Sequence, residues 1–230
     1  MSAAEYNAIV KKYIASKFFG ELKTQLEVLV DAISSVSGKY VWYNGYKDEE
    51  DNEAVIEHLE RVFAYELYYQ WRKLMDDNSS DLTLNGEISK EVYDDIILKQ
   101  TTFYFPDMVL HKGQENKDKQ MIVCEIKRKH SFNPNKFKKD IEKLSWYIDE
   151  KRFSAPFKCG VFILVGYHLG ECWSKNYLDT IREINITSEC TKNIICMYYE
   201  ANKGSSNKLV ISTLYDLINN PNALTDKLKK

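Results

Sequence analysis

The sequence predicts a single α/β domain with a mixed central sheet, preceded by a helical extension. Of the 230 residues, 44% are hydrophobic and 13% aromatic, which is enough for one sizeable core. After residue 50, helical and strand-like patterns alternate along the chain. The most apolar stretch, residues 159–165, is hydrophobic on both faces, as is typical of a central strand covered on both sides.

The composition argues against several classes of protein. No apolar run approaches the roughly 18 residues of a membrane span, and the N-terminal residues lack the basic and then apolar stretch of a signal peptide. The five cysteines include no Cys-x-x-Cys pair, which disfavours both a disulfide framework and a zinc ribbon. We therefore expect a cytoplasmic protein that has no membrane partner.

Residues 1–40 form the helical extension, and residues 41–230 form the α/β domain. Apolar residues recur at helical spacing over 4–19 and 21–36, with Gly20 between the two helices. These helices carry no evident chemistry. We expect them to serve in packing or in a contact between the subunits of a homodimer.

The next helix, expected over about 50–75, has carboxylates on its apolar face. Glu60 falls inside the apolar stripe and Glu66 lies near its edge. A helix that only buries this face would not carry carboxylates there, so we expect at least one of them to face a polar cavity. The alternative is that each glutamate reaches solvent or pairs with a nearby arginine.

Three strand-like segments follow and are expected to form an antiparallel meander. They span 82–88, 105–111 and 121–127. The polar segment between the last two is typical of a hairpin tip. A weaker helical pattern covers 90–99.

The rest of the chain continues the alternation of helix and strand. Helices are expected over 135–151, 174–183 and 213–219. Strands are expected over 159–166, 193–200 and 208–212. A strand, a helix and a further strand in this order predict a right-handed crossover and a parallel pair, which makes the sheet mixed.

Charged residues interrupt two strands of the meander. Asp107 opens one strand, and Glu125 and Lys127 lie two residues apart near the end of the next. Because alternate residues of a strand point to the same face, Glu125 and Lys127 should project together. Charged side chains are rarely buried unless they are paired or bind a metal. We therefore expect a polar site here.

Carboxylates in this arrangement suit Mg²⁺ or Mn²⁺, which prefer hard oxygen ligands and complete their shells with water and substrate phosphate. Such a metal lowers the pKa of a bound water and polarises a phosphoryl oxygen. Lys127 would orient the attacking water or help to deprotonate it, and would offset the charge of the transition state. The combination predicts phosphodiester hydrolysis.

The surrounding segment is basic. Residues 112–152 contain twelve Lys or Arg and seven Asp or Glu, a net charge of +5, although the whole chain carries −2. Local basicity beside carboxylates indicates a polyanionic partner, and a solvated helix face is the alternative. Asp140 and Lys143 could line the site or bind backbone phosphate, and a surface pair three residues apart on a helix is the alternative. The candidates for contact with nucleic acid are Arg128, Lys129, His130, Lys136, Lys139 and Lys143.

A Pro-Asp pair at 106–107, followed by Glu-Ile-Lys at 125–127, resembles the motif of the PD-(D/E)xK nuclease superfamily. The order of elements is also similar, and the resemblance covers roughly residues 50–170. It implies a three-layer α/β/α restriction-endonuclease-like core with a central mixed sheet.

The resemblance also implies roles for individual residues. Asp107 and Glu125 would bind the metal together with the backbone carbonyl of Ile126, and Lys127 would be the catalytic lysine. Members of the superfamily often add a glutamate from the first core helix. Here that glutamate would be Glu66 or Glu60.

The sequence therefore predicts a nuclease that depends on Mg²⁺ or Mn²⁺, with DNA as the first candidate substrate. The alternative is a catalytically inactive module of the same fold that binds nucleic acid or another protein. A third interpretation is a helical scaffold protein in which the motif is incidental.

Overall fold

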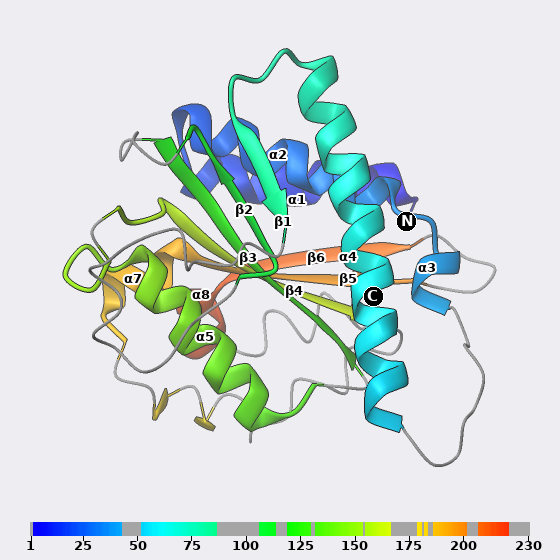
Figure 1. The fold of residues 1–230 in the computed structure, drawn as a ribbon. Coiled ribbons are helices and arrows are strands. Elements are labelled where there is room, and N and C mark those ends of the chain that lie inside the picture. The colour runs from blue at the N-terminus through cyan, green and yellow to red at the C-terminus, as the bar shows by residue number, and fades with distance from the viewer. Residues whose placement is uncertain are drawn as a thin grey trace.

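A mixed sheet of six strands forms the centre of the described structure, in the order β1 to β6 (Figure 1). The computed structural model describes residues 2–42, 52–86, 106–113, 119–129, 132–153, 155–166, 179–180, 182–183, 186–201 and 207–220. The strands are β1 (Thr83–Gly86), β2 (Met108–His111), β3 (Gln120–Arg128), β4 (Cys159–Gly166), β5 (Ile194–Glu200) and β6 (Lys208–Thr213). The predicted α/β class with a mixed sheet is confirmed.

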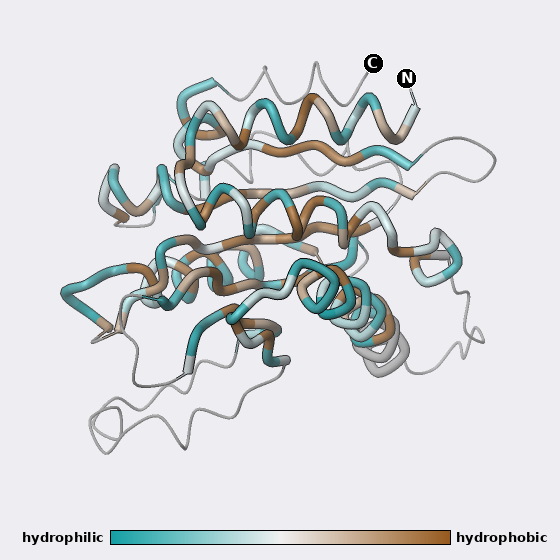
Figure 2. The backbone as a smooth tube through the Cα atoms, turned by 90° about the horizontal axis from the view of Figure 1, so that it is seen from above, coloured by the Kyte–Doolittle hydropathy of each residue, from teal (hydrophilic) through white to brown (hydrophobic). Residues whose placement is uncertain are grey.

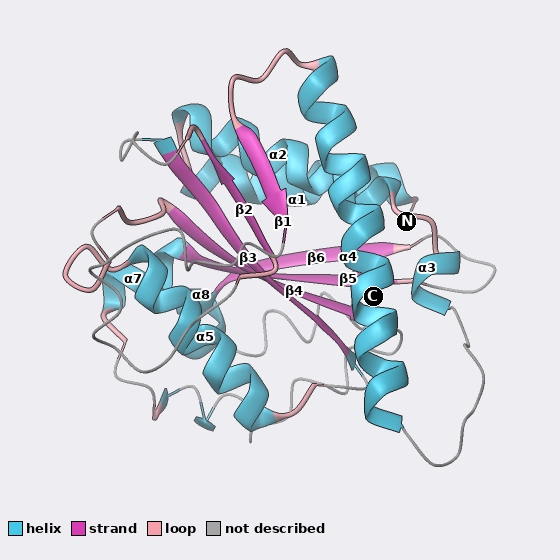
Figure 3. Ribbon diagram, in the orientation of Figure 1, coloured by secondary structure: helices cyan, strands magenta, loops and turns pink. Residues whose placement is uncertain are grey.

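The helices flank this sheet (Figure 3). They are α1 (Ala3–Lys17), α2 (Gly20–Ser35), α3 (Lys39–Trp42), α4 (Asn52–Asp77), α5 (Pro134–Ile148), α7 (Ser188–Asn193) and α8 (Leu214–Asn219). Helices α3 and α7, of four and six residues, were not predicted. The helix expected over 90–99 lies outside the described residues, as does most of the one expected over 174–183.

Strand pairing follows the expected pattern. Strands β1, β2 and β3 are antiparallel neighbours, so the predicted meander is confirmed. Strand β4 runs parallel to both β3 and β5, and β6 returns antiparallel to β5. Helix α5 connects the parallel strands β3 and β4, as a crossover must.

The sheet separates two hydrophobic clusters. Along β3, Ile122, Cys124 and Ile126 belong to the cluster formed with α1, α2 and α4, whereas Val123 belongs to the cluster formed with α5 and α8. This alternation is the two-residue period of a strand. Helices therefore cover both faces of the sheet, and their turns alternate between hydrophobic and hydrophilic residues (Figure 2).

The two N-terminal helices are part of the first cluster. Val10 of α1 and Leu29 of α2 share it with residues of α4 and of the sheet. Gly20 begins α2 with a φ of 59°, a backbone conformation that lets the chain reverse after α1. The expected extension and the α/β domain thus share one core.

None of the helices in the described ranges is long and apolar enough to cross a membrane.

Candidate functional site

Asp107 lies just before β2, beside the end of β3, because the two strands are antiparallel and Met108 pairs with Cys124. Its Oδ2 accepts a hydrogen bond of 2.6 Å from the backbone N–H of Ile126. Burial raises the pKa of Asp107, although the positive charge of Lys127 and the Ile126 N–H oppose the shift. The strand pairing and this bond hold the carboxylate beside the Glu-Ile-Lys segment.

Glu125 is almost completely buried, with 1% of its surface exposed. Its Oε1 lies 2.6 Å from Nζ of Lys143, which comes from α5. Burial raises the pKa of Glu125 well above its ordinary value; the negative charge of Asp107 adds to this shift and Lys143 opposes it. A carboxylate in this environment needs a cationic partner to remain ionised.

Lys127, near the end of β3, reaches Glu60 of α4. Its Nζ lies 3.0 Å from Oε1 of Glu60 and donates a second hydrogen bond of 3.0 Å to the carbonyl of Ile126. Burial opposes the charge on Lys127, but the negative charges of Asp140, Asp107 and Glu60 outweigh it and raise the pKa. The lysine is therefore a cation at neutral pH, which favours a role in orienting water and offsetting charge over the role of a base.

Only one of the two candidate glutamates on α4 reaches this cluster. Glu60 binds Lys127 through one oxygen, and its Oε2 accepts a hydrogen bond of 3.3 Å from the Arg128 N–H. Glu66 instead accepts a hydrogen bond of 2.8 Å from Gln70 on its own helix. The structure thus places Glu60 beside the strand motif.

Two of the basic residues expected to contact nucleic acid are engaged inside the protein. Arg128 is buried, and its guanidinium donates a hydrogen bond to the carbonyl of Val41. Its even position on β3 directs it to the α4 side of the sheet. Lys143 projects inward to Glu125.

The other basic residues that we expected to contact nucleic acid differ in their exposure to solvent. Lys139 is exposed on α5, whereas Lys129 and Lys136 are half-buried. His130 lies outside the described residues.

Asp140, which the motif does not include, also faces the cluster. It lies on α5, whose start is fixed by Pro134 and by the side chain of Asn133, which accepts the Lys136 N–H. Only 8% of Asp140 is exposed, and its Oδ2 has no hydrogen-bond partner among the described residues. Burial is the main reason that its pKa is raised to about 6.

Six charged side chains thus meet at one end of the β2–β3 pair. They are Glu60, Asp107, Glu125, Lys127, Asp140 and Lys143. No three His, Cys, Asp or Glu side chains in the described ranges are arranged to hold a metal ion. Two lysine ammonium groups lie among the carboxylates. Four carboxylates, among them Asp140 with a buried oxygen that has no hydrogen-bond partner in the described ranges, are nevertheless the donors that a hard divalent cation takes.

His111 has a structural role. It is buried on β2, where its Nε2 lies 2.9 Å from the Asn85 amide nitrogen and its Nδ1 lies 3.2 Å from the Gly113 carbonyl. Both ring nitrogens are occupied, as expected for a histidine outside the site.

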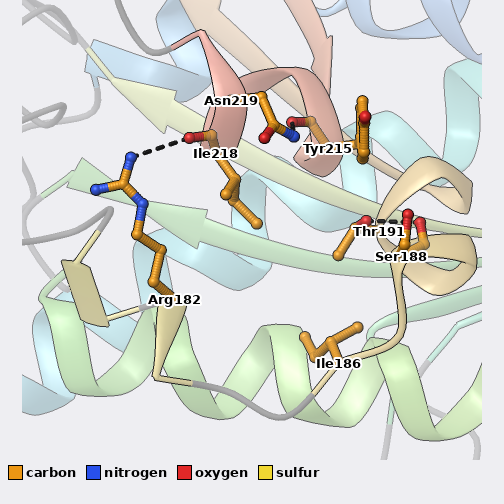
Figure 4. A pocket seen from close by; sticks show the side chains of 7 residues that line it. All are labelled: Arg182, Ile186, Ser188, Thr191, Tyr215, Ile218 and Asn219. Atoms are coloured by element: carbon orange, nitrogen blue, oxygen red, sulfur yellow. Dashed lines mark hydrogen bonds between the residues drawn. The ribbon is translucent and has the colours of Figure 1, made fainter.

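A pocket of about 270 Å³ lies apart from this cluster, between α7 and α8 (Figure 4). Arg182 donates a hydrogen bond of 3.0 Å to the Ile218 carbonyl at one end, and Thr191 donates one of 2.7 Å to the Ser188 carbonyl at the other. None of the residues predicted to form the site lines it.

Comparison with known proteins gives no relative. No protein-family model matches the chain, and neither the curated proteins nor the solved structures include a match.

Proposed function

We propose that this protein hydrolyses phosphodiester bonds of nucleic acid, with DNA as the first candidate, by a PD-(D/E)xK-type site that uses Mg²⁺ or Mn²⁺. The observation that carries the proposal is the convergence of Asp107, Glu125 and Lys127 with Glu60 of α4. Glu60, Asp107 and the Glu125–Lys127 segment come from three separate parts of the chain and meet only through the β2–β3 pairing and the packing of α4. A motif that is merely incidental would not assemble such a group.

The order of elements supports a restriction-endonuclease-like core. A long helix, an antiparallel three-stranded meander, a helix and a parallel strand follow one another from α4 to β4. The acidic residues lie beside the carboxyl end of β3, where β3 is parallel to β4 and antiparallel to β2. The carboxyl ends of parallel strands commonly form ligand sites in α/β proteins.

We assign roles to these residues from the motif and from their positions. Asp107, Glu125 and Glu60, with the carbonyl of Ile126, would hold the divalent cation. Bound there, the cation would supply a water of lowered pKa and a polarised phosphoryl oxygen. Lys127 would remain protonated and stabilise the charge that develops on the phosphoryl oxygens.

The alternative function is that of a binding module without catalysis. The observation that favours it is the neutralisation of two carboxylates by lysine, because Lys127 pairs with Glu60 and Lys143 pairs with Glu125. A protein that has lost its metal could keep its fold through such pairs.

A cleavage assay separates the two functions. The purified chain is incubated with Mg²⁺ or Mn²⁺ and with single-stranded, duplex and branched DNA, and with RNA. We expect cleavage that is abolished in Lys127→Ala and in Asp107→Ala. The matched controls are Lys11→Ala and Asp31→Ala, which break an ion pair between α1 and α2 at a distance from the motif.

The outcomes of the assay are distinct. Cleavage that survives both site variants would overturn the assignment of the site. If no substrate is cut with either metal, the nuclease proposal is wrong, and binding of the same substrates without cleavage would support the binding module.

A further inference from the structure

Asp140 has a buried carboxylate oxygen that lacks a hydrogen-bond partner among the described residues. It is 8% exposed, and Oδ2 has no hydrogen bond within the described part of the chain. Buried polar atoms in proteins are nearly always hydrogen-bonded, and a carboxylate lacking a partner is costly. This oxygen therefore points to a group that binds to the protein.

The position of Asp140 is fixed by its helix. Its neighbours Phe137, Ile141 and Leu144 on α5 are fully buried in the second hydrophobic cluster. An aspartate has a short side chain that cannot extend past such neighbours into solvent, as a lysine can. Asp140 is thus held towards the interior.

Lys143 lies one turn after Asp140 on α5, and its Nζ is 2.6 Å from Oε1 of Glu125. The charges of Lys127, Lys143, Asp107 and Glu60 all act on the Asp140 carboxylate. Among the carboxylates, Asp140 has the largest effect on the pKa of Lys127. A residue of α5 therefore faces the same charged cluster that the strand motif and α4 form.

The cluster has an excess of negative charge. When all are ionised, the four carboxylates and two ammonium groups have a formal charge of −2. Burial raises the pKa values of Asp107, Glu125 and Asp140, so the ionised forms need a further positive charge. The lysines lie within ion-pair distance of Glu60 and Glu125, and the excess falls on Asp107 and Asp140. A single divalent cation would neutralise it.

We infer that Asp140 is a further cation-binding carboxylate of this site, supplied by α5 and absent from the strand motif. The inference rests on the proposed function, which supplies the divalent cation. Mg²⁺ and Mn²⁺ keep several waters in such sites, so Asp140 holds the ion directly or through one of these waters.

Titration calorimetry of the full chain with MnCl₂ tests the inference without any measurement of cleavage. Asp140→Asn keeps the shape of the side chain and removes its charge, and we expect the affinity for Mn²⁺ to fall by about tenfold or more. Asp140→Ala is a second variant with the same expectation. Glu142→Gln is the matched control on the same helix, because the Glu142 side chain is half-buried. The affinity of this variant for Mn²⁺ should stay within about twofold of that of the wild type. Circular dichroism confirms that each variant is folded.

The variant Asp107→Asn separates a failure of the inference about Asp140 from a failure of the proposed function. If wild-type protein binds Mn²⁺ and Asp107→Asn weakens binding while Asp140→Asn does not, Asp140 is not part of the site and the proposed function stands. Equal losses in Asp140→Asn and in Glu142→Gln would also overturn the inference, because they would reflect only the net charge of α5. Wild-type protein that binds no Mn²⁺ would overturn both.

Discussion

Nζ of Lys127 lies 3.0 Å from Oε1 of Glu60, although 67 residues separate the two in the sequence. The pair joins the end of β3 to α4, and both side chains are less than one-fifth exposed. The other oxygen of Glu60 accepts the N–H of Arg128. The link therefore ties the strand that carries the motif to the helix beside it.

Breaking this pair should destabilise the protein. In Lys127→Met, Glu60 loses its cationic partner in a largely dehydrated place, and we expect the free energy of unfolding to fall by about 1 to 3 kcal/mol. Urea denaturation measures the change. The double variant Lys127→Met with Glu60→Gln should lose less than the sum of the single variants, because the two residues are coupled.

The surface pair of Lys11 and Asp31 is the control for that experiment. Its side chains are 35% and 41% exposed, so Lys11→Met should cost about 0 to 1 kcal/mol. An equal cost for Lys11→Met and Lys127→Met would contradict a special role of the interior pair in stability.

Lys143 should compete with a divalent cation for Glu125. Its ammonium group lies 2.6 Å from the glutamate, so its removal in Lys143→Met takes a positive charge away from the place of the cation. We expect the affinity for Mn²⁺ to rise by about tenfold, as measured by calorimetry. Lys139→Met, on an exposed position of the same helix, should leave the affinity unchanged. Weaker binding by Lys143→Met would show that the lysine assists the cation.

Asp140 should make stability fall as the pH rises. Its pKa is raised to about 6 in the folded protein, chiefly by burial, against about 3.9 in an unfolded chain. The folded state therefore binds the proton more tightly, and stability is lost between about pH 4 and pH 6 as the carboxyl ionises.

The variant Asp140→Asn isolates this contribution. In EDTA it should be more stable than the wild type at pH 8, by up to about 3 kcal/mol, and similar to it at pH 4. Urea denaturation at both values checks the difference. A constant difference across this range would show that Asp140 does not titrate within it.

Asp216, at the contact between α1 and α8, should make stability fall as the pH falls, which is the opposite of the effect of Asp140. Burial favours its neutral form, but a 2.5 Å hydrogen bond from the Tyr13 hydroxyl and the ammonium of Lys17 at 3.0 Å outweigh this and lower the pKa of Asp216. Its stabilising effect is thus present above the unfolded pKa, about 3.9, and is lost as the pH falls through the lower folded value.

We expect Asp216→Asn to lower the free energy of unfolding by about 1 kcal/mol at pH 7 and to have less effect at pH 3. Thermal melting at the two pH values tests this. Tyr13→Phe should reproduce part of the loss at pH 7, and a loss in Asp216→Asn that is the same at both values would contradict the expected titration.

Local sequence patterns determined most of the framework. The helical period over α4 and α5, the meander of β1 to β3 and the apolar β4 could each be predicted, since such periods arise from burying one face of an element or both. The same alternation placed Glu125 and Lys127 on one side of β3. The short helices α3 and α7 were missed, whereas α8, which is as short as α7, was predicted.

Only the tertiary structure decided which side chains meet. Glu60 and Glu66 both lie near the apolar stripe of α4, and the level at which the helix crosses β3 brings Glu60 to Lys127. In the same way, the packing of α5 turns Asp140 and Lys143 inward. The sequence by itself determined the elements and the motif, because these depend on neighbours along the chain. The composition of the charged cluster depends on how separate elements pack, which no local pattern contains.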